Sequence, residues 1–253
     1  MNLPFDGKVA FVTGAASGIG RATALRFAAL GAAVAVVDVQ STQGQECAQL
    51  IRSTGAAAVF IEADVSRRQE VTNAVQRVVD EFGRLDVAHN NAGIEGEVTT
   101  LVESSEENWD RVMAINLKGV WLCMHAQIPV MLKGGGGAIV NTASVAGLAG
   151  QVGATAYCAA KHGIIGLTKA AALEYAKAGI RINAVCPGLV HTSMSERLSA
   201  GNPGLVDSLA AMSPIGRAGR PSEIAEAVVW LCSDAASYMV GHALTVDGGV
   251  LAQ

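Results

Sequence analysis

The sequence has little charge and few aromatic side chains. Asp, Glu, Lys and Arg make up 16% of its 253 residues, and Phe, Tyr and Trp make up 4%. Acidic and basic residues are interspersed without a long block of one sign, and the formal net charge at pH 7 is −4. Proteins that bind nucleic acid carry a basic stripe or patch. The sequence shows none, which argues against nucleic acid as a partner.

Cysteine and histidine are scarce and scattered. The five cysteines form no C-x-x-C pair and their number is odd, and the five histidines show no H-x-x-x-H spacing. Disulfide frameworks and zinc sites both need recurrent spacings of these residues. The sequence therefore predicts no metal site, and it predicts reduced thiols of the kind found in cytoplasmic proteins.

The apolar runs are short. The run at 32–39 is far below the roughly 20 residues that span a bilayer. Residues 1–14 lack the basic and apolar regions of a signal peptide. We expect a cytoplasmic protein with no membrane partner.

What the sequence does contain is a regular alternation of short β-branched runs with longer Ala-rich stretches. The predicted strands are 8–14, 32–39, 57–65, 85–93, 137–144, 180–188 and 243–249. The predicted helices are 18–31, 41–55, 66–83 with Ser66 as N-cap, 105–132, 154–179 and 221–234. Nearly continuous apolar strands that alternate with helices indicate a doubly wound parallel α/β sheet covered on both faces. The irregular segment 188–219 is long enough to form a lid over a site, or a surface loop with a short helix.

A glycine-rich turn follows the first predicted strand. Gly14, Gly18 and Gly20 stand in the stretch TGAASGIG, whose spacing differs from the general dinucleotide fingerprint G-x-G-x-x-G. Glycines permit a tight turn and a close backbone approach, and a pyrophosphate can bind at the N-terminus of the following helix. Glycine turns also occur without a ligand, so this motif alone leaves both interpretations open.

Asp38 strengthens the nucleotide interpretation. It ends the second predicted strand, 24 positions after Gly14, close to the spacing of about 20 at which an acid binds the adenosine ribose. A carboxylate there accepts hydrogen bonds from the ribose hydroxyls and repels a 2′-phosphate. Val39 and Gln40 add no cation, so the sequence favours NAD over NADP. The alternative is an ordinary acid at a strand end or a helix cap.

The stretch YCAAK places Tyr157 and Lys161 four residues apart in a predicted helix. That spacing puts the two side chains on one face, one turn apart. Taken alone, the pair is typical of a packed ring beside an exposed polar face. Trp109, Trp121 and Trp230 also fall in predicted helices, where core or interface positions are the simplest interpretation.

Taken together and in this order, the motifs resemble the short-chain dehydrogenase/reductase family over essentially the whole chain. The matching segments are TGAASGIG at 13–20, Asp64-Val65, NNAG at 90–93, Asn116, Ser144, YCAAK at 157–161, PGLVHT at 187–192 and DGG at 247–249. The resemblance implies a single Rossmann-like domain over 1–253 with about seven parallel strands, a nicotinamide cofactor, and a homotetramer.

The resemblance also implies a catalytic tetrad and a cofactor site. The tetrad consists of Asn116, Ser144, Tyr157 and Lys161. The implied cofactor-binding residues are Gly14, Ser17, Gly18, Ile19, Gly20, Asp38, Val39, Asp64, Val65, Asn91, Ala92, Gly93, Tyr157, Lys161, Pro187, Gly188, Val190 and Thr192. Asp64 and Val65 would lie near the adenine, and Pro187 and Gly188 beside the nicotinamide.

The tetrad gives the Tyr157–Lys161 pair a chemical purpose. A free tyrosine has a pKa of about 10 and is a poor base at neutral pH. The positive charges of Lys161 and of an oxidised nicotinamide ring favour the phenolate, so we expect them to lower the pKa of Tyr157. Ser144 would hold the substrate oxygen, Lys161 would also bind the nicotinamide ribose, and Asn116 would hold a water that connects Lys161 to solvent.

The substrate is less well defined. In the family, the pocket is formed by the segments after Ser144, after NNAG and within 188–219. The predicted substrate-binding residues are Ser144, Ala146, Gln151, Tyr157, Gly188 and His191, with Val145, Leu148, Ile94, Glu95, Leu189 and Met194 nearby. The mostly apolar set suits a compact cyclic, aromatic or aliphatic secondary alcohol or its ketone. A sugar or polyol bound through Glu95, Gln151 and His191, or a non-catalytic NAD(H) sensor, are the alternatives.

Overall fold

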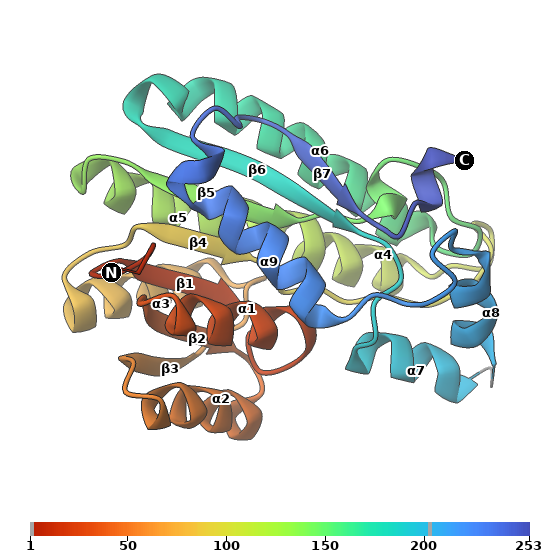
Figure 1. Cartoon of the computed structure of the whole chain (residues 1–253). Coiled ribbons are helices and arrows are strands. Elements are labelled where there is room, and N and C mark those ends of the chain that lie inside the picture. Colours follow the sequence, from red (N-terminus) through yellow and green to blue (C-terminus); the bar gives the residue numbers. More distant parts are fainter. Residues whose placement is uncertain (1–2, 202–203) are drawn as a thin grey trace.

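The computed structural model describes residues 3–201 and 204–253. In that part of the chain, one parallel sheet runs in the order β3-β2-β1-β4-β5-β6-β7 (Figure 1). The strands are β1 (Val9–Thr13), β2 (Ala33–Asp38), β3 (Ala58–Glu62), β4 (Val87–Asn90), β5 (Gly137–Thr142), β6 (Ile180–Pro187) and β7 (Ala243–Val246). All neighbouring pairs are parallel. The predicted doubly wound, Rossmann-like sheet is confirmed.

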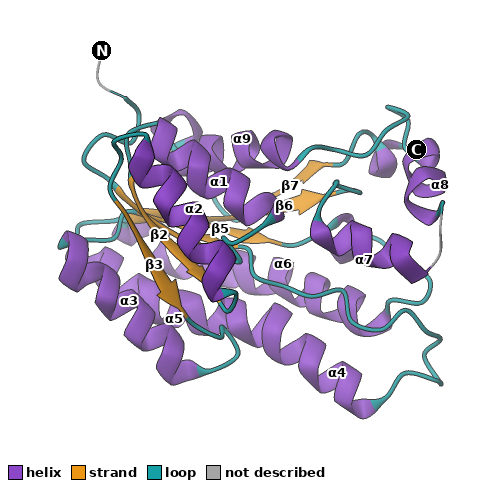
Figure 2. Cartoon of the chain, turned by 90° about the horizontal axis from the view of Figure 1, so that it is seen from below, coloured by secondary structure: helices purple, strands orange, loops and turns teal. Residues whose placement is uncertain are grey.

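Helices cover both faces of the sheet (Figure 2). One layer holds α1 (Gly18–Ala29), α2 (Ser41–Ser53) and α9 (Pro221–Cys232), and the other holds α3 (Arg68–Phe82), α5 (Gly119–Lys133) and α6 (Thr155–Tyr175). Successive strand residues point to opposite faces. Val36 therefore packs in the first layer's core and Val37 in the second, which explains why the strands are apolar throughout. Within the described residues, none of the helices has the length and apolar content needed to cross a membrane.

The carboxyl ends of the strands form the functional edge of the sheet. The strand order reverses between β1 and β4, and ligands of open α/β sheets bind outside the carboxyl ends at such a reversal. Two helices, α7 (Ser193–Gly201) and α8 (Leu205–Met212), lie at this end (Figure 1). The segment 188–219 thus holds two helices rather than a loop with one short helix. Residues 202 and 203 of the predicted lid lie outside the described residues.

The helix predicted over 105–132 is interrupted. It begins as α4 (Glu106–Val112), where Ser105 caps the N-terminus by accepting a hydrogen bond from Asn108 N. A π-helical turn over Met113–Lys118 follows, and α5 then continues to Lys133. π-turns inside α-helices occur frequently at functional sites. This one carries Asn116, whose side chain is fully buried.

The predicted N-cap of the third helix is wrong. Helix α3 begins at Arg68, and Arg67 occupies the N-cap position. The Ser66 hydroxyl instead donates to Asp64 Oδ1 at 2.7 Å, and Ser66 N donates to the same oxygen at 2.9 Å. The Asp64 carboxylate holds Ser66 in a local turn, and the N-cap lies one residue later than predicted.

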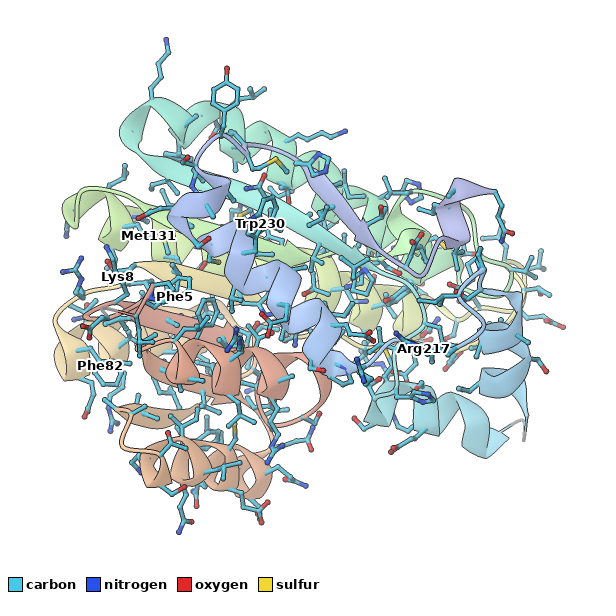
Figure 3. The ribbon with its side chains drawn as sticks, in the orientation of Figure 1. Phe5, Lys8, Phe82, Met131, Arg217 and Trp230 are labelled. Carbon is cyan, nitrogen blue, oxygen red and sulfur yellow. The ribbon has the colours of Figure 1, made fainter. Side chains whose placement is uncertain are left out.

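The three tryptophans are not core residues. Trp109, Trp121 and Trp230 are 41%, 39% and 42% exposed, and Trp230 lies on α9 (Figure 3). The sequence left core and interface positions open for these tryptophans. Their exposure excludes core positions, and interface positions stay a prediction. The homotetramer stays a prediction.

Candidate active site

A cavity of about 450 Å³ opens at the carboxyl ends of the strands, within the usual size range of ligand pockets. Most of the predicted cofactor residues line it. They are Gly14, Ser17, Gly18, Ile19, Asp38, Val39, Asp64, Val65, Asn91, Ala92, Gly93, Pro187, Gly188, Val190 and Thr192. Ser144, Tyr157 and Lys161 line the same cavity. Segments that are distant in sequence therefore meet where the topology predicts a ligand.

The glycine-rich turn forms one end of this cavity. Gly14 and Gly18 have φ values of +63° and +52°, in the left-handed region that favours glycine. Gly20 does not line the cavity. A β-carbon there would overlap the carbonyl oxygen of Gly14, so Gly20 permits the first turn of α1 to pack against the turn that precedes it.

The start of α1 fits a phosphate group. Ser17, its N-cap residue, makes no capping hydrogen bond through its side chain. In the described part of the chain, the N–H groups of Gly18, Ile19 and Gly20 donate to no protein acceptor. Unpaired N–H groups together with the positive end of the helix dipole form an anion site. This geometry fits the pyrophosphate of a dinucleotide.

Asp38 has a structural and a ligand-facing role. Its side chain is 7% exposed and lines the cavity. Oδ2 accepts a hydrogen bond from Ala16 N at 2.9 Å, and Oδ1 accepts one from Gln40 N at 3.0 Å. The carboxylate thus anchors the glycine turn and the start of α2, as the alternative interpretation expected. Each oxygen keeps a second lone pair, which leaves acceptors available for ribose hydroxyls.

Ser144, Tyr157 and Lys161 approach one another from two elements. Ser144 follows β5 and accepts a hydrogen bond from Ala146 N at 3.1 Å. Tyr157 stands in the first turn of α6, and Lys161 follows one turn later. Lys161 Nζ donates to Thr142 O at 2.8 Å and lies 5.3 Å from the centroid of the Tyr157 ring. An ammonium has three donors, so two remain for a ligand.

Burial dominates the ionisation of this pair. It raises the pKa of Tyr157 to about 12, with the Ser144 hydroxyl lowering that pKa and the Glu95 carboxylate and Cys158 raising it. Burial lowers the pKa of Lys161 to about 8. The direction for Tyr157 is opposite to the sequence-based expectation, because the loss of hydration of the phenolate is the largest influence on this pKa.

Asn116 lies behind the cavity, fully buried in the π-helical turn. Its Oδ1 accepts a hydrogen bond from Ile94 N at 2.8 Å, and its Nδ2 donates to Ile94 O at 2.8 Å. The side chain therefore fixes the loop that follows β4. The water predicted for Asn116 stays a prediction.

The predicted substrate residues divide into two groups. Ser144, Tyr157 and Gly188 line the cavity, whereas Ala146, Gln151 and His191 are absent from its lining. Gln151 and His191 are exposed, and Ala146 is buried. Their substrate contacts stay predictions.

Several lining residues were not predicted, among them Ile115, Thr142, Ser195 and Arg197. Arg197 in α7 lines the cavity and pairs with Glu95. The sequence contained a signal for this pair, because opposite charges stand in the two segments expected to flank the substrate.

A buried histidine lies beneath the site. His89 in β4 is fully buried, and its Nε2 lies 2.8 Å from Thr142 Oγ1. Thr142 Oγ1 in turn donates to Asn91 Oδ1 at 3.3 Å, so the order of donors assigns the imidazole proton to Nε2. Within the described residues, Nδ1 has no partner. Burial lowers the pKa of His89 to about 3.

We expect His89 to make the fold sensitive to acid. Below the unfolded pKa of about 6.5, the unfolded chain binds a proton that the folded chain does not, so the free energy of unfolding falls as pH decreases. This contribution amounts to about 2 kcal/mol between pH 7 and pH 5. Urea unfolding should be measured at pH 7 and at pH 5. Between these pH values the free energy of unfolding of His89→Leu should fall by about 2 kcal/mol less than that of the wild type. The exposed His162→Gln should follow the wild type, and an unchanged acid loss in His89→Leu would contradict the assignment.

Comparisons with known proteins agree with the geometry. A family model described as enoyl-(acyl carrier protein) reductase matches residues 14–251. Cyclohexanol dehydrogenase of Acinetobacter sp. (strain SE19) is 45% identical over 248 residues, covering 98% of this chain and 96% of that protein. Cis-4-hydroxycyclohexanecarboxylate dehydrogenase of Sinomonas cyclohexanicum is 45% identical over 252 residues, covering all of both chains.

A solved structure shows the same fold. The crystal structure of levodione reductase matches with a TM-score of 0.94 at 38% identity, covering 98% of this chain and 99% of that one. The family model spans nearly the whole chain, and the relatives match along their full length. With a seven-stranded parallel sheet and a cavity where the family motifs meet, this chain belongs to the short-chain dehydrogenase/reductase family, whose members are oxidoreductases that generally use nicotinamide cofactors.

Proposed function

We propose that the protein is an NAD-dependent dehydrogenase that interconverts a compact cyclic secondary alcohol and its ketone. The observation that carries this proposal is the shared cavity, in which Ser144, Tyr157 and Lys161 stand together with Asp38 and the glycine turn. The relatives support a cyclic substrate but differ in its charge, since one is named for the neutral cyclohexanol and the other for hydroxycyclohexanecarboxylate.

The residues present fit a nicotinamide dinucleotide. The open N–H groups at the start of α1 suit its pyrophosphate, and Asp38 offers acceptors to the adenosine ribose. Val39 and Gln40, which also line the cavity beside Asp38, carry no charge that would attract a 2′-phosphate. When bound, the cofactor supplies the hydride acceptor for alcohol oxidation and the hydride donor for ketone reduction.

The chain's own residues manage the proton and the substrate oxygen. In oxidation, Tyr157 Oη takes the proton of the substrate hydroxyl, and in reduction it returns a proton to the oxygen. Ser144 lines the cavity beside Tyr157, and its hydroxyl accepts a hydrogen bond from Ala146 N while keeping its own proton to donate to the same oxygen. Such a bond positions the reacting carbon and stabilises charge on the oxygen.

Lys161 stabilises the phenolate form of Tyr157. Its ammonium is held by Thr142 O at 2.8 Å and stands near the tyrosine ring. Burial raises the pKa of Tyr157 in the ligand-free chain, so a further positive charge in the cavity is needed to bring that pKa toward neutrality. An oxidised nicotinamide ring carries such a charge.

A sugar or polyol is the weaker alternative. The polar residues that would recognise several hydroxyls, Glu95, Gln151 and His191, do not line the cavity, whereas Ile94, Leu189 and Met194 do. An apolar wall of this kind favours a hydrocarbon ring over a polyol.

The test is absorbance at the NADH band with the purified protein. We expect reduction of NAD in the presence of cyclohexanol, at a kcat/KM at least tenfold above that for sorbitol or for linear secondary alcohols. Turnover of sorbitol alone would favour the polyol alternative. Tight NADH binding with no turnover of any alcohol would contradict the proposal and favour a non-catalytic sensor.

A further inference from the structure

One ion pair crosses the substrate end of the cavity. Arg197 Nε donates to Glu95 Oε1 at 3.0 Å, and Arg197 Nη2 donates to Glu95 Oε2 at 3.2 Å. The two residues are separated by 102 positions in the sequence. Two parallel hydrogen bonds between a guanidinium and a carboxylate form the bidentate geometry that is the strongest arrangement for this pair.

The pair joins α7, which carries the lining residue Arg197, to the loop after β4, where Glu95 follows the lining residue Ile94. Glu95 lies in the loop after β4, which is fixed on both sides because Asn116 holds both backbone groups of Ile94 and Asn108 Oδ1 accepts from Glu97 N at 2.9 Å. Arg197 lies in α7, the helix whose first residue, Ser193, has its hydroxyl 3.4 Å from that of Ser17 in the glycine turn. Helix α7 thus spans the cavity from the cofactor turn to the Glu95 loop.

Arg197 faces the region where a substrate would lie. Among the cavity-lining residues in 3–201 and 204–253, the cations are Lys161 and Arg197. Lys161 is held by Thr142 O next to Tyr157. Arg197 lines the cavity together with the apolar residues Ile94, Leu189 and Met194, and its partner Glu95 follows Ile94 in the chain. A guanidinium in that place would bind a substrate carboxylate strongly if nothing neutralised it.

Glu95 neutralises it. A substrate carboxylate that approached Arg197 would be repelled by the nearby Glu95 carboxylate. It would also lose hydration without a net positive charge to compensate, because the ion pair is neutral overall. A protein can discriminate against a charged ligand by placing a group of the same charge where that ligand would bind. The same carboxylate raises the pKa of Tyr157 through its charge, which places it within electrostatic reach of the reacting oxygen.

We infer that the Glu95–Arg197 pair restricts the pocket to uncharged cyclic alcohols and ketones, by occupying the guanidinium that would otherwise bind a carboxylate. Glu95 is then a specificity-determining residue. The inference rests on the proposed function for the identity of the substrate, but the charge preference itself can be measured by binding alone.

The test compares two ligands of nearly the same shape. Calorimetry in the presence of NAD measures the dissociation constants of cyclohexanecarboxylate and of the neutral cyclohexanecarboxamide for each variant. We expect the wild type to prefer the carboxamide. Glu95→Gln should shift the preference toward the carboxylate by about tenfold, the effect of one charge-assisted hydrogen bond. Adding Arg197→Gln to that variant should remove the gain.

Two further variants complete the design. Glu226→Gln removes a carboxylate that pairs with Arg26 at 2.7 Å between α9 and α1, and it should leave the preference unchanged. Arg197→Gln alone leaves the Glu95 carboxylate unpaired, and it should shift the preference further toward the carboxamide. This second variant keeps the inference testable if Glu95→Gln does not fold.

The outcomes separate the inference from the proposed function. Tighter binding of the carboxylate by the wild type, or weaker binding of it in Glu95→Gln, would make Arg197 a carboxylate anchor and overturn the inference. Cyclohexanol oxidation is measured on the same samples. Its absence would contradict the proposed function, while the two dissociation constants would still decide the charge preference.

Discussion

Replacing Tyr157 by Phe is expected to lower kcat/KM for cyclohexanol oxidation by about 10³-fold, the usual scale for loss of a general acid–base group. The substitution keeps the ring on the first turn of α6 and removes only the hydroxyl oxygen that lines the cavity. Without that oxygen, the protein has no group at this position to take the substrate proton. Ser144 cannot replace Tyr157, because a serine hydroxyl is too weak a base to take the substrate proton at neutral pH.

Cofactor binding should survive this change. The glycine turn, Asp38 and Lys161 reach the cavity from other positions and do not depend on the phenol for their own hydrogen bonds. Titration of NADH fluorescence should therefore give a dissociation constant within about threefold of the wild type.

The matched control is Tyr175→Phe. Tyr175 ends the same helix, is only partly buried, and does not line the cavity. It should keep wild-type turnover. If Tyr157→Phe oxidised cyclohexanol within tenfold of the wild-type kcat/KM, another group would have to carry the proton, and the role assigned to Tyr157 would be wrong.

The sheet and most of the cavity could be predicted from the sequence because their determinants are local. Apolar runs of four to eight residues between Ala-rich helices define parallel strands. Once strands are parallel, residues at their carboxyl ends must share one edge, which brings Asp38, Asn91 and Ser144 together. Left-handed glycines such as Gly14 mark the tight turn at the same edge.

The parts that escaped prediction depend on distant or subtle contacts. The π-helical turn spans only six residues, too few to show a periodicity of its own, so nothing in the sequence around Asn116 separates it from an α-helix. What fixes Asn116 is a pair of hydrogen bonds to Ile94, 22 residues earlier in the chain. Arg197 and Glu95 likewise meet only because the sheet places the β4 loop opposite α7.

The pKa of Tyr157 escaped prediction for a different reason. The sequence shows that a lysine stands one turn away, but it does not show how much hydration the phenol loses on burial. That loss outweighs the other influences and raises the pKa. We therefore expect activation of the phenol to require a positive charge brought close to it.

Cofactor choice should depend mainly on Asp38. We expect the double variant Asp38→Ser/Val39→Arg to shift the ratio of kcat/KM for NADP over NAD by about 10³-fold. Two effects add. The variant loses a charged acceptor for the ribose hydroxyls and gains a guanidinium for the 2′-phosphate, each worth about 1.5–3 kcal/mol as a charge-assisted hydrogen bond. Val39 suits the new side chain because it is 59% exposed and lines the cavity.

The single variants separate these effects from the structural role of Asp38. Val39→Arg alone keeps the carboxylate, which still repels the 2′-phosphate, so its shift should be less than tenfold. Asp38→Ser alone gives up the carboxylate acceptors of Ala16 N and Gln40 N, and it should lower stability by about 1–3 kcal/mol, read as a fall of several degrees in Tm. Initial rates with NAD and with NADP, measured below the Tm of every variant, give the ratio of kcat/KM that tests the role of Asp38. A wild type that used NADP as well as NAD, or a double variant with a shift below tenfold, would show that Asp38 holds the glycine turn in place without selecting the cofactor.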